Sequence, residues 1–439
     1  MSTTLTDMKQ ELSNLGLDPN TFCFAPYITT DLDQSGNVYS CYRGNDSVGN
    51  WKEDKIENFI NGNGLQNIRK DLYNGVRHSN CVSCWKAEDS NAKSPRVDFF
   101  NDYKNLVKDK KKLIERIKSQ PHIGKTNELK RTEIRPSSLC NLQCMHCGPR
   151  SSTKWVNFLT DKDNFETYEH ANNKVDHKDM SDSVSYDNIT TVFKSTLTSD
   201  SKYKDEIKKL LADSESIHFT GGEPLLTPEH VDWLEYMIAN NSTNQTLVYN
   251  SNLNIKNIER YFDYWKQFKQ VEIVCSIDAS FSTYDYFRMQ GDIEIVKDSI
   301  TKIKQSKLDN IKLKGSITFN MFSALRWKEI LQDWIDFDLD FHSSLVLKNA
   351  VSSLNLPDKL RTQCIDQMKS CLNDVTALST SKEFIDRFTY FTNDCLAYLE
   401  NNFNNKDKFD QNILDFLKMC EKTNNKKTID YFPELVDYV

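Results

Sequence analysis

The chain is short of glycine and proline, with 13 and 10 among 439 residues, and it contains neither an internal repeat nor a low-complexity linker. It also lacks an apolar run long enough to span a bilayer. Its first residues, Met1–Asp7, are polar and lack the apolar core of a signal peptide, which predicts a cytoplasmic protein without a membrane partner. The length suggests two or three domains with room for a sizeable core.

An excess of positive charge is absent as well. The chain has 56 basic and 63 acidic residues, a net charge of -7, which argues against broad nucleic-acid binding. A run of lysines, Lys110–Lys112, lies in an amphipathic pattern with Leu113, Ile114 and Ile117. Such a pattern is typical of the solvated face of a helix.

Cysteine, in contrast, is plentiful, with 12 residues in the chain. In a reducing compartment these residues serve as ligands or buried thiols rather than as disulfides. Seven of them fall into two clusters along the sequence. The other five are scattered among apolar patterns and are predicted to be packing residues: Cys275, Cys364, Cys371, Cys395 and Cys420.

Cys140, Cys144 and Cys147 lie in one short stretch, with three and then two residues between them. Clustered thiolates are soft ligands that select iron–sulfur clusters, zinc or copper(I). Zinc and ordinary electron-transfer clusters need four protein ligands, yet the next cysteine along the chain is Cys275. A loop of three thiolates can hold a 4Fe–4S cluster with one iron left open for a substrate. The alternative is a structural zinc site with a distant fourth ligand.

Further along the chain, a strand expected over residues 216–220 runs directly into Gly221, Gly222, Glu223 and Pro224. The glycines let backbone carbonyl groups approach a ligand closely. The carboxylate of Glu223 can pair with an ammonium group, and the proline stiffens the exit. This tetrapeptide is weak evidence by itself, but it follows the loop of three cysteines by about one βα unit.

The loop Cys140–Cys147 and the turn Gly221–Pro224 together resemble the radical S-adenosylmethionine (SAM) superfamily. The resemblance implies that the three cysteines hold a 4Fe–4S cluster, whose open iron chelates SAM through its amino and carboxylate groups. It also implies that Gly221, Gly222 and Glu223 receive the amino group of the methionine part. An electron from the cluster would cleave SAM to methionine and a 5′-deoxyadenosyl radical, which takes a hydrogen atom from the substrate.

Four more residues at strand ends resemble SAM contacts of this superfamily. Ser276 and Asp278 form a Ser-x-Asp strand end, and Asn252 stands where members often carry the asparagine of a Thr-Asn-Gly turn. Arg288 resembles the arginine that follows the Ser-x-Asp strand, and it can pair with a carboxylate. For each residue the alternative is an ordinary polar loop position. His146 takes the place of an aromatic residue that packs near the adenine.

Strands and helices alternate between residues 126 and 350. Six strands are expected, from Ile134 to Leu347, with helices between them. Repeated βα units imply a parallel sheet with right-handed crossovers, and six units fall short of a closed eight-stranded barrel. The resemblance implies an α/β fold with an open, partial (β/α)6 TIM-like barrel that carries its site at the strand ends. His218, inside the second strand, is predicted to be a hydrogen-bonded core residue.

The first 125 residues contain the second cysteine cluster: Cys23, Cys41, Cys81 and Cys84. Within it, Phe22–Tyr27 is predicted to be a short strand or turn, and Asp31–Cys41 a β-hairpin that turns at Gly36. Four thiolates can complete one site for zinc or for an iron–sulfur cluster. The layout resembles the shortened, one-cluster twitch form of a SPASM domain, which implies an auxiliary 4Fe–4S cluster. In the superfamily such a module more often follows the core, whereas here it precedes it.

Two regions lie outside these motifs. Residues 160–200 are polar and are expected to form an irregular insertion or lid, after a first barrel helix over residues 150–159. Beyond residue 350 the sequence predicts helices without strands. The expected domains are an N-terminal α+β auxiliary-cluster domain (1–125), a radical SAM core (126–350) and a helical C-terminal cap (351–439).

The sequence therefore predicts a radical SAM enzyme with one auxiliary cluster that acts on a peptide, a protein or a small molecule. Such an enzyme needs an electron donor of the flavodoxin or ferredoxin type. The alternative is a non-catalytic iron–sulfur or zinc protein that acts as an electron carrier or binding module. Gly221–Glu223 distinguishes the two, because a carrier needs no ammonium site. The fold alone does not select the substrate.

Overall fold

The computed structural model describes residues 3–89, 94–172, 186–187, 189–190, 204–345, 350–402 and 406–439. The chain divides into two compact units. The first comprises Met1–Ser137, Ser195–Tyr249 and Lys266–Val271, and the second comprises Ser138–Lys194, Asn250–Trp265 and Glu272–Val439. Because both units draw on several chain segments, each contains residues from distant parts of the sequence.

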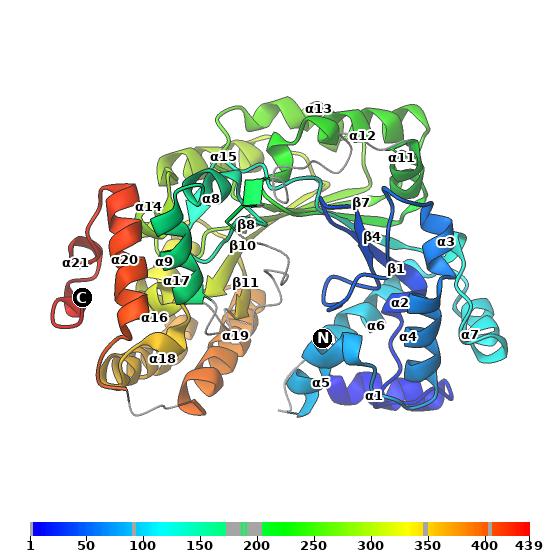
Figure 1. The fold of residues 1–439 in the computed structure, drawn as a ribbon, viewed down its shortest axis with the longest axis horizontal. Coiled ribbons are helices and arrows are strands. Elements are labelled where there is room, and N and C mark those ends of the chain that lie inside the picture. The colour runs from blue at the N-terminus through cyan, green and yellow to red at the C-terminus, as the bar shows by residue number, and fades with distance from the viewer. Residues whose placement is uncertain are drawn as a thin grey trace. The chain divides into compact units, whose positions relative to one another are not determined.

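The first unit begins with a group of helices (Figure 1). Their buried apolar side chains form two cores. The first helix starts at a capping box, in which the side chain of Thr4 accepts a hydrogen bond from the backbone of Asp7. One core joins α1, α2, α6 and α7, and the other joins α4, α5 and α6. The helices are α1 (Leu5–Asn14), α2 (Ala25–Ile28), α3 (Ile56–Ile60), α4 (Asn63–Tyr73), α5 (Val82–Asp89), α6 (Pro95–Leu106) and α7 (Lys110–Ser119).

The sheet of the first unit combines a parallel part with an antiparallel edge. Its strands lie in the order β3, β2, β1, β4, β6 and β7. The pairs β1–β4, β4–β6 and β6–β7 are parallel, whereas β1–β2 and β2–β3 are antiparallel. The strands are β1 (Thr29–Leu32), β2 (Asn37–Tyr39), β3 (Gly49–Asn50), β4 (Arg131–Ile134), β6 (Ser216–Phe219) and β7 (Thr246–Ser251). The helices α11 (Lys204–Asp213) and α12 (Pro228–Ala239) precede β6 and β7 in the chain and contact one another.

The predicted hairpin is confirmed, since β1 and β2 pair and Gly36 lies in the turn between them with a φ of 91°. The hairpin also has an unexpected neighbour. β1 pairs in parallel with β4, so that Asp31 lies opposite Glu133. The N-terminal cysteine-rich segment therefore contributes strands to the same sheet as the strand that leads to Cys140.

The second unit contains most of β8 (Gln270–Ser276) together with β10 (Ile311–Phe319) and β11 (Asp340–Leu345). β10 lies between β8 and β11, and β10 and β11 are parallel. A separate two-stranded ladder joins β5 (Gln143–Cys144) to β9 (Arg288–Met289) in antiparallel orientation. This ladder fixes part of the cysteine loop to a segment more than a hundred residues further along the chain.

Beyond residue 350, the described part of the second unit contains helices and no strand. α17 packs on α18, and α19 packs on both α18 and β11 (Figure 1). The helices of the whole second unit are α8 (Thr153–Phe158), α9 (Lys162–Asn172), α13 (Phe262–Trp265), α14 (Tyr284–Phe287), α15 (Ile293–Gln305), α16 (Met321–Leu325), α17 (Trp327–Asp336), α18 (Asp358–Leu378), α19 (Lys382–Glu400), α20 (Gln411–Asn424) and α21 (Thr428–Tyr431).

Three local predictions were wrong. Phe22–Tyr27 was expected as a strand or turn, yet Pro26 lies in the first turn of the helix α2. The first barrel helix covers only Thr153–Phe158. Residues 162–172 form the helix α9 rather than an irregular segment, because Phe165, Tyr168 and Ala171 recur at helical spacing and are buried. Most of the remaining expected lid lies outside the described residues.

The alternation of strands and helices was predicted correctly. β4, β6, β7, β8, β10 and β11 occur in chain order where the six strands were expected, and the fold is of the mixed α/β class with parallel strand pairs. The five scattered cysteines are all buried, as expected of packing residues. In the part of the chain that the structure describes, no helix has the length and apolar character needed to cross a membrane.

Candidate functional site

The loop Cys140–Cys147 is held from two sides within the second unit. On one side, Gln143 and Cys144 pair with Met289 and Arg288 across β5 and β9. The ladder is extended by the backbone N–H of Met145, which donates to the carbonyl of Phe287 at 3.0 Å. The hydrogen bonding of a strand therefore continues one residue beyond β5 into the middle of the loop.

On the other side, the start of α8 holds the loop. Ser152 caps this helix, and its hydroxyl also donates to the carbonyl of Leu142 at 2.6 Å. The indole N–H of Trp155, a fully buried side chain, donates to the carbonyl of Cys144 at 2.9 Å. These bonds satisfy carbonyl groups that a turn would otherwise leave buried without partners.

The sulfur of Cys140 has two hydrogen-bond donors suited to a thiolate. The backbone N–H of Leu142 donates to Sγ of Cys140 at 3.4 Å, and the amide of Asn252 lies 3.8 Å from the same sulfur. A hydrogen bond between Cys144 and Cys147 lowers the pKa of the first thiol and raises that of the second. The N–H donors to Cys140 favour its anionic form, which is the form that binds a metal.

A buried ionic group lies behind the loop. Asp278 is 1% exposed, forms an ion pair with Arg288, and lies 3.5 Å from Nε2 of His146. Its Oδ1 also accepts a hydrogen bond from the backbone N–H of Thr318 at 2.7 Å. Burial works against ionisation, but the neighbouring charges of Arg288 and His146 outweigh it, so the pKa of Asp278 lies below its ordinary value.

His146 fits between this group and an aromatic ring. Its ring stacks on Phe287 at a centroid distance of 5.2 Å with 3° between the planes, and its Nε2 lies 3.7 Å from Sγ of Cys147. Burial lowers the pKa of His146 against the opposing effect of Asp278. His146 therefore contacts both the cysteine loop and Asp278, which follows β8.

The turn Gly221–Pro224 lies in the first unit, at the end of β6. Gly221 has a φ of 104°, and a Cβ atom there would lie 2.8 Å from the carbonyl oxygen of Ser137. The backbone N–H of Gly222 donates to that same carbonyl at 3.0 Å. Glu223 is 1% exposed, and its carboxylate accepts a hydrogen bond from the N–H of Leu225 at 3.1 Å. Only glycine suits the first position.

The second cysteine cluster surrounds one cavity in the first unit. Cys23, Cys41, Cys81 and Cys84 all line it, together with Trp85, Arg96 and Phe99. The cysteines come from three separate segments, before α2, after β2, and at the start of α5. Cys81 and Cys84 lie on consecutive helical turns rather than in an isolated turn.

The four thiols suit a bound metal centre. Burial raises the pKa of all four, to about 12 for Cys81 and about 11 for Cys84. Opposing this, the N–H of Ala25 donates to Sγ of Cys23 at 3.4 Å, and backbone N–H groups of Arg43 and Arg96 hydrogen-bond to Cys41 and Cys84. Thiols that are buried together with donors aimed at their sulfurs are typical of a ligand set.

Among the described residues, no group of three or more His, Cys, Asp or Glu side chains is arranged around a single metal ion. Zinc requires four donors about 2.3 Å from one centre. A cubane cluster instead takes each thiolate at a different iron, so its four ligands surround a larger body than a single zinc ion.

The structure brings several predicted site residues together. Cys140 and Asn252 share a hydrogen bond, and Cys144 pairs with Arg288, which in turn pairs with Asp278. Ser276 lies half-buried at the end of β8. His218 hydrogen-bonds Arg131 at 3.1 Å and is only partly buried.

Sequence reasoning missed the supporting residues of both cysteine clusters. Trp155 and Ser152 were read only as part of a helix, although a Ser-Ser-Thr stretch before an aromatic helix is a capping signal. Arg96, which lines the cavity of the four cysteines, follows a proline at the start of α6 and carries no local signal of its position.

The family model of the Radical SAM superfamily matches residues 134–322, a range that contains Cys140–Cys147 and Gly221–Glu223. No curated protein matches the chain.

Solved structures also show similarity. The chain is similar to native anSMEcpe with bound AdoMet, at 16% identity and a TM-score of 0.38 over 56% of this chain and 62% of that chain. Two structures of Streptococcus suis SuiB are similar at 13% identity. The one bound to S-adenosylmethionine has a TM-score of 0.33 over 72% of this chain and 62% of that one. The one bound to the precursor peptide SuiA has a TM-score of 0.31 over 66% and 58%. The chain thus spans about three-fifths of the length of these proteins.

Proposed function

We propose that the chain is a radical SAM enzyme whose 4Fe–4S cluster is held by Cys140, Cys144 and Cys147. The observation that carries the proposal is the three-thiol loop itself, which lies inside the range 134–322 that matches the superfamily. The sulfur of Cys140 has an N–H donor and an amide donor, and the backbone of the loop is held by β9 and α8. When bound, the cluster supplies the electron that cleaves SAM to methionine and a 5′-deoxyadenosyl radical.

The residues of the chain would position SAM rather than react with it. Gly221 allows the backbone after β6 to approach Ser137 closely, and the same lack of a Cβ atom leaves carbonyl groups accessible to a ligand. The carboxyl group of Glu223 is buried, and a carboxylate there would suit the ammonium of the methionine part. Burial also excludes water and stray hydrogen donors from a radical.

Asn252, Ser276, Asp278 and Arg288 are further proposed SAM contacts. Asn252 and Arg288 are supported by their contacts with the cysteine loop. Arg288 and Asp278 form an ion pair. Their proposed role is to orient the loop, and the guanidinium N–H groups that do not contact Asp278 would bind a carboxylate.

For the N-terminal cluster we propose an auxiliary 4Fe–4S centre of the twitch type, held by Cys23, Cys41, Cys81 and Cys84. All four thiols line one cavity, and four ligands are enough to fill every iron of one cubane. Such a cluster has no open iron for a substrate, so it would support the fold or pass an electron. Within this proposal residues 1–125 form the auxiliary domain, 126–350 an open (β/α)6 core and 351–439 the cap.

The substrate is proposed to be a peptide, a protein or a small molecule, and the electron donor a flavodoxin or ferredoxin. A cytoplasmic location belongs to the same proposal, because clusters of this kind require a reducing compartment.

Iron content tests the two cluster assignments. Two cubanes give about 8 Fe per reconstituted chain, and changing Cys140, Cys144 and Cys147 to alanine should leave about 4 Fe. Zinc in that triple variant, with little iron, would make the N-terminal set a zinc site. Cys81→Ala with Cys84→Ala should spare SAM cleavage but abolish product formation on the true substrate.

SAM binding tests the role of Glu223. A charged hydrogen bond contributes about 1.5–3 kcal/mol, so Glu223→Ala should weaken SAM binding about 10- to 100-fold while iron loading is unchanged. The change in the EPR signal of the reduced cluster on SAM titration reports the affinity. Unchanged affinity would remove Glu223 from the site.

A further inference from the structure

Arg96 is a buried cation beside the N-terminal four-cysteine cavity. It is 2% exposed, lies in the first turn of α6, and lines the cavity together with the four cysteines. Its guanidinium lies 5.2 Å from the ring of Trp85, another residue of the cavity wall. A buried charge is costly unless it has partners or a counter-charge. Its position therefore requires an explanation.

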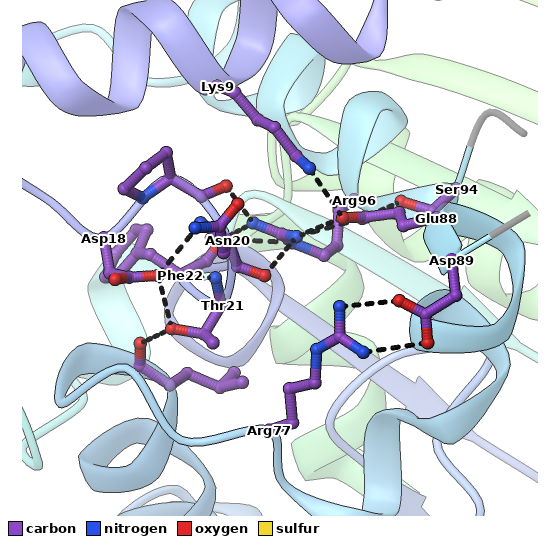
Figure 2. A network of polar contacts seen from close by, with 12 residues as sticks. Lys9, Asp18, Asn20, Thr21, Phe22, Arg77, Glu88, Asp89, Ser94 and Arg96 are labelled. Atoms are coloured by element: carbon purple, nitrogen blue, oxygen red, sulfur yellow. Dashed lines mark hydrogen bonds and ion pairs between the residues drawn. The ribbon is translucent and has the colours of Figure 1, made fainter. Parts of the chain in front are cut away.

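The guanidinium is held in place by a dense set of acceptors. Nε and Nη2 donate to the carbonyl of Phe22 at 3.2 and 2.8 Å, and Nη1 donates to the carbonyl of Asn20 at 2.9 Å. Nη1 also donates to both carboxylate oxygens of Glu88, at 2.9 and 2.7 Å. Figure 2 shows Arg96 between these carbonyl groups and Glu88. The charge therefore cannot move away from the cavity.

Glu88 is the matching buried anion, at 6% exposure. It lies on α5, the helix that carries Cys84, and its carboxylate accepts a hydrogen bond from Ser94 at 2.5 Å (Figure 2). Lys9 is a more distant neighbour at 3.9 Å. The pair therefore places a positive charge in the wall of the cavity and a negative charge on the helix that carries Cys84.

The two charges lie at different positions relative to the thiols. Arg96 is part of the wall of the cavity that the four cysteines line. Glu88 follows Cys84 by four residues on α5, about one helical turn, so the two side chains lie on the same face of the helix.

We propose that Arg96 and Glu88 set the reduction potential of the auxiliary cluster, Arg96 raising it and Glu88 lowering it. This inference rests on the proposed assignment of a 4Fe–4S cluster to Cys23, Cys41, Cys81 and Cys84. Reduction takes one electron from an external reductant and adds it to a centre that four thiolates have already made anionic. A nearby fixed cation favours that step and a nearby anion opposes it, and the low dielectric of a buried site strengthens both effects. Arg96 and Glu88 are positioning residues that touch no reacting atom.

A merely structural network would behave differently. If the pair only joined α5 to α6, neutralising either residue would loosen the same contacts and disturb the cluster in the same way. The electrostatic role instead requires potential shifts of opposite sign. Arg77 offers a matched control, because it pairs with Asp89 on α5 and lies 5.5 Å from the ring of Trp85 but is largely exposed (Figure 2).

The experiment is an EPR-monitored redox titration of the reconstituted full-length protein with both clusters. SAM identifies the first cluster by perturbing its signal, so the signal that SAM leaves unchanged reports the auxiliary cluster. Arg96→Gln should lower the midpoint potential of that signal and Glu88→Gln should raise it. Arg96→Lys should stay near wild type because it retains the charge, and Arg77→Gln should leave the potential unchanged because solvent screens its charge.

Each outcome decides the question. Unchanged potentials, or shifts of the same sign in Arg96→Gln and Glu88→Gln, would overturn the inference. If Arg96→Gln does not load iron, the Glu88→Gln potential decides alone, and an upward shift with retained iron supports the proposal. A wild-type protein with about 4 Fe and no second EPR signal would instead refute the auxiliary cluster itself.

Discussion

Asp278→Asn is the substitution that best tests the buried ionic group behind the cysteine loop. Asp278 has a φ of 60°, a backbone conformation that asparagine tolerates well, so the change removes the charge without adding backbone strain. The Oδ1 atom of asparagine can still accept the hydrogen bond from the N–H of Thr318. The main loss is the counter-charge of Arg288.

The size of the effect follows from burial. Arg288 is 5% exposed and would become a buried cation without its carboxylate. Removing one partner of a buried ion pair typically costs about 3–5 kcal/mol. For a folded unit of 150 to 250 residues, about 1 kcal/mol lowers the melting temperature by about 2–4 °C. Asp278→Asn should therefore lower the melting temperature of the second unit by roughly 6–20 °C.

Differential scanning calorimetry measures this shift, with Glu294→Gln as the control. Glu294 pairs with Lys297 at the surface, where such pairs contribute less than about 1 kcal/mol. The double variant Asp278→Asn with Arg288→Met should recover most of the loss, because it leaves no unpaired charge. A melting temperature of Asp278→Asn within about 2 °C of wild type would refute the reasoning, since Arg288 would then be compensated elsewhere.

Two further predictions concern backbone strain and pH. Gly221→Ala should destabilise the first unit by more than about 1–3 kcal/mol, because it adds a contact with the carbonyl of Ser137 at 2.8 Å to the cost of a positive φ. Denaturant titration measures the free energy of unfolding of this variant and of a control, Gly75→Ala. At Gly75 φ is also positive, but the atom nearest to an added Cβ is 3.5 Å away, so the control should lose only the free energy that the positive φ costs. Burial raises the pKa of Asp333 to about 6 despite a hydrogen bond from the N–H of Phe281. Its stabilising contribution is therefore present below about pH 4 and lost as the pH rises through about 6. Asp333→Asn removes this pH dependence. The free energy of unfolding of the variant, relative to that of wild type, should therefore rise by on the order of 1 kcal/mol between pH 4 and pH 7. An equal difference between variant and wild type at both pH values would contradict the assignment.

The parts of the molecule that sequence reasoning described well are local. The strand over Ser216–Phe219 and the turn that follows it are defined by a short apolar run and two glycines, and the structure has both. The hairpin at Gly36 follows from turn chemistry within a dozen residues.

The parts that it missed depend on contacts between distant segments. The pairing of Asp31 with Glu133 and of Cys144 with Arg288 joins residues more than a hundred positions apart, so no local pattern reveals either. The helix α9 was mistaken for a loop because its polar residues outnumber Phe165, Tyr168 and Ala171, which pack on tertiary neighbours. Tertiary packing overrides local composition in such segments.

Anaerobic incubation of the reconstituted protein with SAM and dithionite tests the central claim most directly. The account predicts that 5′-deoxyadenosine forms, and that it does not form when Cys140, Cys144 and Cys147 are changed to alanine. Fully iron-loaded wild-type protein that produces no 5′-deoxyadenosine would contradict the account and favour a non-catalytic electron carrier.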